Sequence, residues 1–333
     1  MRIVVNGLGR MGRLFVRAAI DRGLTVAAVN EPKGSLDQLA LGVEFDSVQG
    51  RWHRTAAAEA GSLRLGDQRV AVHQSTDWHT LPLADGGPTL VVECSGKAKR
   101  RELLEPLFAA GASAILVSNP VPDVPNLVFG VNHGGVDFAA APVVTAASCT
   151  TNCLAPVVRV LHDAIGIRRG LVTTIHDPTN TQTVTDRADK DPRRGRSALL
   201  NLIPTSTNSA TAVTLIVPEL AGKLDSIAVR APVLNASLTD CNFEMQRPTS
   251  VDEVNAALAA AAGSGPLQGI LGYEERPLVS SDFAHDPRSA IVDAACTRVV
   301  DGHLVKVMAW YDNEWGYVNR MVDLVGCIVQ ARA

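Results

Sequence analysis

The chain has 333 residues, of which 46% are hydrophobic and 20% are charged, a globular composition that argues against disorder and provides enough length for two domains. A formal net charge of -3 and a pI near 6.2 give no electrostatic reason to expect a nucleic acid or an acidic membrane surface as a partner. No apolar run has the length of a membrane span, and no export signal precedes the first predicted strand, so we expect a cytoplasmic protein without membrane insertion. The six cysteines lack the spacing of a zinc site or a disulfide scaffold, so we expect no metal.

The N-terminal segment has the pattern of a strand, a glycine turn and a helix. Residues 2–6 are predicted to form the strand, and an amphipathic helix is expected after the turn. In such a turn Gly7 permits the sharp bend, Gly9 lets a pyrophosphate approach the backbone, and Gly12 lets the helix pack on the strand. The pattern predicts a dinucleotide-binding site.

The next predicted strand, residues 25–30, indicates which dinucleotide is bound. It ends at Glu31, whose carboxylate is placed to accept hydrogen bonds from the adenosine ribose hydroxyls. A carboxylate there repels the extra phosphate of NADP, so NAD is favoured; Lys33 nearby leaves NADP as a weaker alternative. Two later strands, residues 90–94 and 114–118, run into loops with glycine or proline, which is typical of the ligand-binding edge of a doubly wound parallel sheet.

A cysteine stands where a strand gives way to a helix. Residues 142–147 are β-prone, and apolar residues recur at helical spacing between Cys149 and Gly166. The N-terminus of a helix favours a thiolate, which attacks carbonyl carbon, so we interpret Cys149 as a nucleophile. The alternative is that Cys149 is only a small buried hydrophobic residue.

A histidine ends the next predicted strand, residues 170–175. His176 is of a type that stabilises a thiolate and then shuttles the proton of the adduct, although a lone histidine is more often simply a satisfied polar residue. The polar segment from residue 176 to residue 202 is long and irregular, so we expect a neighbouring subunit to support it.

These motifs resemble the phosphorylating glyceraldehyde-3-phosphate dehydrogenases, at residues 6–12, 147–156, 173–176 and 310–317, and the likeness covers essentially the whole chain. The resemblance implies that Cys149 is the nucleophile, that His176 is the base, and that Asn313, with Tyr317 beside it, fixes the nicotinamide carboxamide. It also implies a Rossmann domain of residues 1–148 and 314–333, whose last helix returns to it. Residues 149–313 would form an α+β catalytic domain with a mixed sheet. The expected cofactor-binding residues are Asn6, Gly7, Gly9, Arg10, Met11, Gly12, Glu31, Ser95, Gly96, Ser118, Asn313 and Tyr317.

The implied reaction is NAD-dependent oxidation of glyceraldehyde 3-phosphate through a thioester that inorganic phosphate resolves. The resemblance places the substrate phosphate near Thr179, Thr181 and Arg230, and the attacking anion near Ser148, Thr150, Arg194, Thr207 and Asn208. Two positions depart from the family pattern. Asn208 stands where a glycine is usual, which puts the geometry of the attacking pocket in question. Asp177 and Pro178 replace small or aromatic residues, and Asp177 adds a negative charge beside the expected substrate.

Residues 30–34, 234–241 and 275–280 are similar to the branch found with arsenate-resistance genes, which accepts arsenate and makes 1-arseno-3-phosphoglycerate for an efflux permease. Residues 281–290 resemble erythrose-4-phosphate dehydrogenase, in which water resolves the thioester, and this stays an alternative. An alternative of another class is a non-catalytic NAD-binding or RNA-binding module. The family resemblance further implies a homotetramer.

Overall fold

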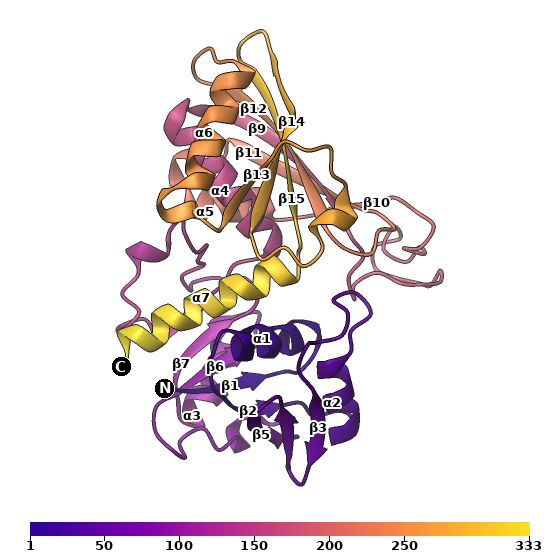
Figure 1. The fold of residues 1–333 in the computed structure, drawn as a ribbon, viewed down its shortest axis with the longest axis vertical. Helices are drawn as coiled ribbons and strands as arrows, with labels where there is room; N and C mark the ends of the chain where they lie inside the picture. Colours follow the sequence, from indigo (N-terminus) through magenta and orange to yellow (C-terminus); the bar gives the residue numbers. More distant parts are fainter. The chain divides into compact units, whose positions relative to one another are not determined.

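The computed structural model describes all residues from 1 to 333 and divides into two compact units (Figure 1). The first unit comprises Met1–Ser148 and Val318–Ala333, and the second comprises Cys149–Tyr317. None of the helices combines the length and the apolar composition needed to cross a bilayer.

The first unit is built on an eight-stranded sheet in the order β3-β4-β5-β2-β1-β6-β7-β8. Its strands are β1 (Arg2–Asn6), β2 (Val26–Asn30), β3 (Ala56–Glu59), β4 (Ser62–Leu65), β5 (Gln68–His73), β6 (Thr89–Glu93), β7 (Ala112–Val117) and β8 (Val143–Thr145). Its helices are α1 (Arg10–Asp21), α2 (Leu36–Glu44) and α3 (Glu105–Ala109). Six neighbouring strands of this sheet, β5, β2, β1, β6, β7 and β8, pair in parallel, which confirms the predicted doubly wound sheet. The strands β3 and β4 form an antiparallel edge next to β5.

The last helix, α7 (Trp315–Ala331), ends on this first unit. Arg22 pairs with Asp323 of α7 at 2.6 Å. Just beyond the helix, Arg332 donates to the carbonyl oxygens of Phe138 and Ala141 at 2.8 and 2.7 Å. These contacts fasten the C-terminus to the unit that contains the glycine turn, as the predicted returning helix requires.

The second unit is built on a seven-stranded mixed sheet in the order β10-β11-β9-β12-β15-β14-β13. Its strands are β9 (Ile167–His176), β10 (Ile203–Ser206), β11 (Leu224–Arg230), β12 (Ser237–Met245), β13 (Leu271–Glu274), β14 (Ala290–Val300) and β15 (Leu304–Tyr311), and its helices are α4 (Cys149–Ala164), α5 (Ser209–Ile216) and α6 (Val251–Gly263). Figure 1 shows these three helices on one face of the sheet. The mixed sheet with helices confirms the predicted catalytic domain architecture.

Side-chain alternation along β9 determines which residues meet the helices. Val172, Thr174 and His176 are buried, whereas Leu171 and Ile175, which alternate with them, are 66% and 38% exposed. Because successive side chains of a strand point to opposite faces, His176 lies on the helix-covered face. The strand therefore presents its histidine to the side on which α4 begins.

Candidate active site

The three glycines of the N-terminal turn meet three different surroundings. Gly7 has a positive φ of 97°, and a Cβ atom there would lie 2.7 Å from the backbone of Ser95. A Cβ atom on Gly12 would lie 1.9 Å from the carbonyl oxygen of Gly7, whereas one on Gly9 would meet no heavy atom within 4 Å. Gly7 and Gly12 are thus required by the fold itself, while Gly9 leaves open space at the start of α1, where the backbone N–H groups of a helix N-terminus favour the binding of an anion.

A pocket of about 260 Å³ lies beside this turn. Its lining residues are Asn6, Gly7, Gly9, Asn30, Glu31, Pro32, Lys33, Thr76, Trp78, Cys94, Ser95 and Lys97. The Glu31 carboxylate is held at the pocket by the backbone N–H groups of Leu8 and Lys33, at 3.0 and 3.3 Å. The pocket therefore offers an oriented carboxylate next to the open space at Gly9, as adenosine and pyrophosphate recognition requires.

A buried polar network supports the floor of this pocket. The Asn6 amide donates to the carboxylate of Glu93 and accepts from Asn30 at 2.8 Å, and the Ser95 N–H donates to Glu93 at 2.8 Å. Burial raises the pKa of Glu93 to about 6, although the hydrogen bonds from Ser95 and Asn6 oppose the rise. Asn6, through its side-chain amide, and Ser95, through its backbone N–H and its hydroxyl, thus hold the turn against β6; both were predicted to bind the cofactor.

The other predicted cofactor residues of this unit lie around the same turn. Arg10 begins α1 and pairs with the carboxylate of Asp46, and Met11 follows it in the first helical turn. Gly96 has a φ of 70° with open space around it. The backbone N–H of Ser118 donates to the carbonyl of Glu93 at 2.9 Å.

In the second unit, the predicted nucleophile begins a helix. Cys149 is the first residue of α4 and follows a turn in which Ala147 has a φ of 52°, a left-handed conformation that costs a non-glycine residue roughly 1–2 kcal/mol. The Cys149 Sγ lies 3.8 Å from Nε2 of His176 and 3.9 Å from the hydroxyl of Thr150, which in turn bonds the Tyr311 hydroxyl at 2.9 Å. The strand register and the helix start therefore bring the thiol and the imidazole together.

The strand register places further polar residues in a row with His176. On one side, Arg230 of β11 pairs in register with His176. On the other side, Leu238 of β12 pairs with Ile175, so Ser237 comes level with His176, and Ser237 itself pairs with Tyr311 of β15. Four adjacent strands thus supply one row of polar side chains beside the thiol.

Asp177 is buried, and its carboxylate binds residues of this row. Oδ1 lies 2.6 Å from Nδ1 of His176 and accepts from the Ser237 hydroxyl at 3.2 Å. Oδ2 accepts from the Asn313 amide at 3.2 Å. The sequence suggested a charge beside the substrate, whereas the side chain, 3% exposed, turns inward onto the imidazole because β12 and the end of β15 provide donors there.

The surroundings of His176 favour its protonated form. Burial opposes protonation, but hydrogen bonds and charge from Asp177 and Cys149 outweigh it and raise the pKa of His176 to about 9. Arg230 Nη1 lies 2.7 Å from Nδ1 of His176 and donates to the Asp177 carbonyl at 2.9 Å. Its Nε is buried without a hydrogen-bond partner, so the guanidinium retains a donor for an anion.

The remaining predicted anion-binding residues bond mainly within their own segments. The hydroxyls of Thr179 and Thr181 lie 3.0 Å apart, and Arg194 Nε donates to Thr205 at 2.9 Å. The Thr207 hydroxyl donates to that of Ser209 at 3.2 Å, at the start of α5. Ser148 immediately precedes Cys149 in the chain, and Tyr317 is buried in the first turn of α7.

Asn208 does not need to be glycine. It precedes α5 with a φ of -103°, which any residue can adopt, and its exposed side chain makes no capping bond. The departure from the family pattern is therefore accommodated by a side chain that lies at the surface.

Comparison with known proteins agrees with this arrangement. Residues 1–101 match the model for the glyceraldehyde 3-phosphate dehydrogenase NAD binding domain, and residues 148–313 match that for the C-terminal domain. The chain is 53% identical over 326 residues to glyceraldehyde-3-phosphate dehydrogenase 3 of Nostoc sp., which covers 97% of each chain. The chain belongs to the glyceraldehyde-3-phosphate dehydrogenase family. Other similar members are those of Pseudomonas aeruginosa, 46% identical over 100% of this chain and 99% of that one, and of Zymomonas mobilis, 44% identical over 97% of each.

Membership in this family confirms two predictions made from the sequence, the enzyme class and NAD as the cofactor. The geometry of the first unit fits that cofactor, because the Gly9 backbone is open and the Glu31 carboxylate is fixed beside it.

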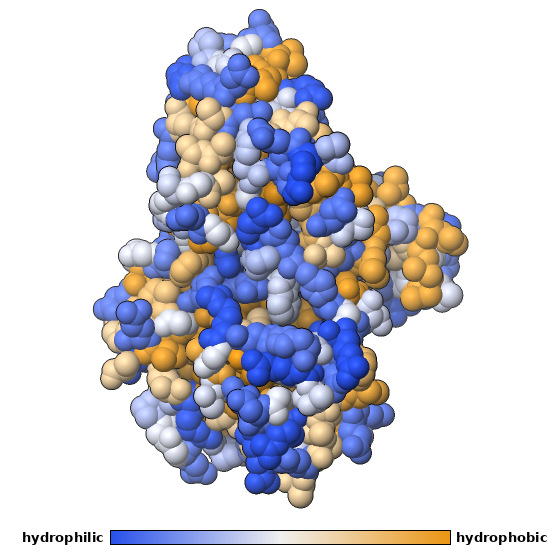
Figure 2. Space-filling view, in the orientation of Figure 1, coloured by the Kyte–Doolittle hydropathy of each residue, from blue (hydrophilic) through white to orange (hydrophobic).

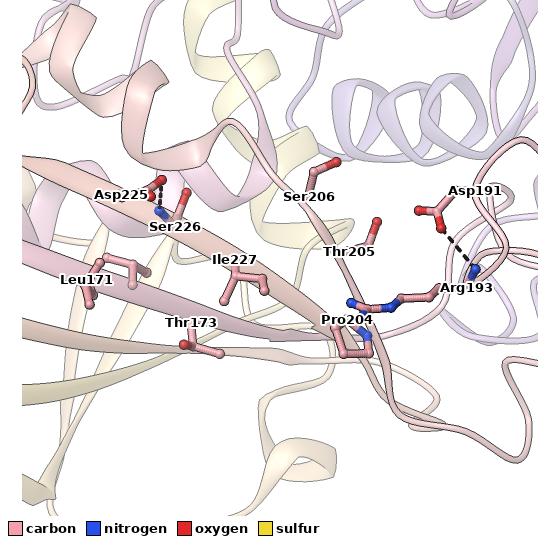
Figure 3. A pocket seen from close by; sticks show the side chains of 11 residues that line it. Leu171, Thr173, Asp191, Arg193, Pro204, Thr205, Ser206, Asp225, Ser226 and Ile227 are labelled. Atoms are coloured by element: carbon pink, nitrogen blue, oxygen red, sulfur yellow. Dashed lines mark hydrogen bonds between the residues drawn. The ribbon is translucent and has the colours of Figure 1, made fainter.

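A second cavity, of about 610 Å³, lies on the other face of the catalytic sheet (Figure 3). Leu171, Thr173 and Ile227 line it from adjacent strands, and Asp191 and Arg193 line it from the segment between β9 and β10. Because Leu171 and Thr173 alternate with His176 along β9, this cavity and the thiol lie on opposite faces of the sheet.

Sequence reasoning missed four residues of these sites. Glu93 is the last residue of the apolar strand β6. An acidic residue at the end of a buried strand is a signal in the sequence, and it was overlooked. Asp177 was noticed only as an atypical charge, although an acid next to a candidate histidine is a local signal. Ser237 and Tyr311 carry no such signal, because only the register of β9, β12 and β15 brings them beside His176.

Proposed function

We propose that the enzyme oxidises glyceraldehyde 3-phosphate with NAD and that inorganic phosphate or arsenate resolves a thioester on Cys149. The observation that carries this proposal is the distance of 3.8 Å between Cys149 Sγ and His176 Nε2 at the start of α4, in a chain of this family. A helix N-terminus and an imidazole both favour a thiolate, the form that adds to an aldehyde carbon.

In the proposed reaction, His176 takes the thiol proton and the Cys149 thiolate bonds to the aldehyde carbon. When bound, NAD supplies the acceptor for the hydride that the adduct loses as its carbonyl re-forms as a thioester. An oxygen of the inorganic anion then attacks the thioester carbon, and the Cys149 thiolate leaves. The product is 1,3-bisphosphoglycerate with phosphate or 1-arseno-3-phosphoglycerate with arsenate.

We assign the substrate phosphate to Thr179, Thr181 and Arg230, and we assign the attacking anion to the group formed by Ser148, Thr150, Arg194, Thr207 and Asn208. The unpartnered buried Nε of Arg230 supports the first assignment, since a guanidinium fork binds phosphate through charge-assisted hydrogen bonds. The Asn313 amide, with Tyr317 beside it, is assigned to the nicotinamide carboxamide. The NAD-binding domain then comprises residues 1–148 and 314–333, and the catalytic domain comprises residues 149–313.

Omitting the inorganic anion tests the covalent step. Without phosphate or arsenate, we expect a burst of about one NADH per active site, and adding either anion should restore turnover. Cys149→Ser should abolish the burst. Steady turnover on erythrose 4-phosphate in the absence of an inorganic anion would instead favour the erythrose-4-phosphate dehydrogenase alternative.

The arsenate role is part of the same proposal. Arsenate has the shape and charge of phosphate, so hydroxyls and arginines that bind one also bind the other. We propose that the product made with arsenate serves detoxification through an efflux permease. Assays with each anion at matched concentrations test this, and absence of turnover with arsenate would contradict it.

We also propose a cytoplasmic homotetramer. Supporting this, the open sheet face exposes Leu171 and Ile227, and Figure 2 shows hydrophobic atoms gathered over the segment between β9 and β10, where Leu199 and Leu200 are 60% and 83% exposed. Apolar surface of this kind is typical of a subunit interface. Sedimentation velocity would measure the assembly size.

A further inference from the structure

The pocket beside the glycine turn has one wall to which the proposed function gives no task. Thr76 and Trp78 line this wall from the segment that follows β5. Trp78 begins a short 3₁₀ helix, Trp78–Thr80, and is the only aromatic residue in the pocket lining. The Gly9 backbone and the Glu31 carboxylate suit a pyrophosphate and a ribose, so the flat base of the dinucleotide still lacks a partner.

The order of the strands brings this wall to the place where the base should lie. Gly9 follows β1, Glu31 follows β2 and Trp78 follows β5, and these strands are parallel neighbours in the order β5-β2-β1. Their carboxyl ends therefore meet at one edge of the sheet, about 4.8 Å from strand to strand. Because the ribose joins the pyrophosphate to the base, a dinucleotide held at Gly9 and Glu31 directs its base toward the segment after β5.

Hydrogen bonds anchor this segment beside Glu31. The side-chain amide of Asn30, the residue before Glu31, accepts from the backbone N–H of Ser75 at 3.0 Å and donates to the carbonyl oxygen of Ser75 at 3.1 Å. The Asp77 carboxylate then caps the 3₁₀ helix by accepting from a backbone N–H at 3.0 Å. The backbone that carries Trp78 is therefore fixed to the end of β2, where the ribose is expected.

The Trp78 side chain is only partly buried. It packs against the apolar cluster that includes Leu81 and Ala98, and it also lines the pocket. Trp52 of the same unit differs, since it is 4% exposed and its indole N–H donates to Asp21 at 2.8 Å. The Trp52 ring is thus enclosed by the fold, whereas the Trp78 ring keeps apolar surface that a ligand in the pocket can cover.

We propose that Trp78 is a cofactor-binding residue whose indole ring stacks on the adenine of NAD. This inference rests on NAD as the cofactor and on the expected contact of Glu31 with the ribose, and it does not depend on the thioester. Stacking on an aromatic side chain removes the faces of both rings from water and adds favourable ring-to-ring contacts. Trp78 therefore contributes to the affinity for the adenosine half of NAD and takes no part in hydride transfer.

Calorimetric titration of the full-length enzyme with ADP-ribose tests the proposal, because this probe contains the adenosine and the pyrophosphate but no nicotinamide. Trp78→Ala should raise the Kd for ADP-ribose at least about fivefold, since it removes the stacking surface. Trp78→Phe keeps an aromatic face and should stay within about threefold of the wild type. His79→Ala, at the next residue of the 3₁₀ helix and outside the pocket lining, is the matched control and should leave the Kd unchanged. An unchanged Kd in Trp78→Ala would overturn the proposal.

Tryptophan fluorescence provides a second test, which detects the contact itself. Adenine stacked on an indole quenches its emission, so ADP-ribose should reduce the fluorescence of the wild type and of Trp52→Phe but should leave that of Trp78→Phe unchanged. Equal quenching in the wild type and in Trp78→Phe would overturn the proposal even if Trp78→Ala does not fold. If the wild type makes no NADH from glyceraldehyde 3-phosphate, the proposed function fails, while the binding of ADP-ribose still decides the role of Trp78.

Discussion

The Glu31 carboxylate accepts a hydrogen bond from the backbone N–H of Leu8 at 3.0 Å. The acid that follows β2 is thereby fixed against the glycine turn that follows β1. Its position depends on the pairing of these two strands, and its second oxygen, 3.3 Å from the N–H of Lys33, is equally oriented.

Replacing Glu31 should weaken NAD binding and improve NADP binding. We propose that Glu31 accepts charge-assisted hydrogen bonds from the ribose hydroxyls, each worth about 1.5–3 kcal/mol. Glu31→Ser should remove them, so we expect the Kd for NAD to rise at least about tenfold. The repulsion of the NADP phosphate disappears as well. Fluorescence titration with both cofactors measures this. Asp67→Ser, at a side chain 84% exposed, is the control, and an unchanged preference in Glu31→Ser would contradict the assignment.

Two glycine substitutions should separate binding from folding. A methyl group on Gly9 meets nothing within 4 Å, so Gly9→Ala should unfold at nearly the wild-type temperature but bind NAD at least about tenfold more weakly. A methyl group on Gly12 would lie 1.9 Å from the Gly7 carbonyl, so Gly12→Ala should lose about 3 kcal/mol or more of stability. Thermal unfolding and NAD titration of both variants provide the comparison. Equal stability of the two would refute the packing role of Gly12.

Glu93 should make the free energy of unfolding depend on pH in the mildly acidic range. Its pKa is raised from 4.5 to about 6, so the folded state holds the proton more tightly than the unfolded chain. The Glu93 carboxyl makes its full contribution to the free energy of unfolding below pH 4.5. This contribution, about 2 kcal/mol, is lost as the pH rises through about 6. Because other carboxylates titrate too, the measurement is the difference in unfolding free energy between wild type and Glu93→Gln across this range. Exposed Glu105→Gln is the control and should reproduce the wild-type curve.

Arg230 should determine affinity for the phosphate of the substrate. Arg230→Lys keeps the charge but loses the planar fork, so the KM for glyceraldehyde 3-phosphate should rise about tenfold or more. The KM for glyceraldehyde, which lacks the phosphate, should change much less, so the ratio of the two isolates the phosphate contact from any effect on His176. Parallel increases for both substrates would argue against this role.

The elements whose signals are local were predictable. The strand, glycine turn and helix of residues 2–21 and the helix that starts at Cys149 each depend on a short pattern of apolar and glycine residues. The position of Asp177 was not predictable, because its partners Ser237 and Asn313 lie 60 and 136 residues away along the chain. The antiparallel edge formed by β3 and β4 was also missed, since its strands have four residues each and a weak alternation.

The pairing of β9 with β12, in which Leu238 lies opposite Ile175, affects more than the shape of the sheet. Because side chains alternate between faces, a slip of one residue along β9 would turn His176 to the open face and replace it with Ile175 beside the thiol. Such a chain could keep its hydrogen-bonded ladder yet be chemically inert. Redesign of the segment between β9 and β10 should therefore leave every residue up to Thr181 in its present frame and confine insertions to the positions between Thr181 and Arg194.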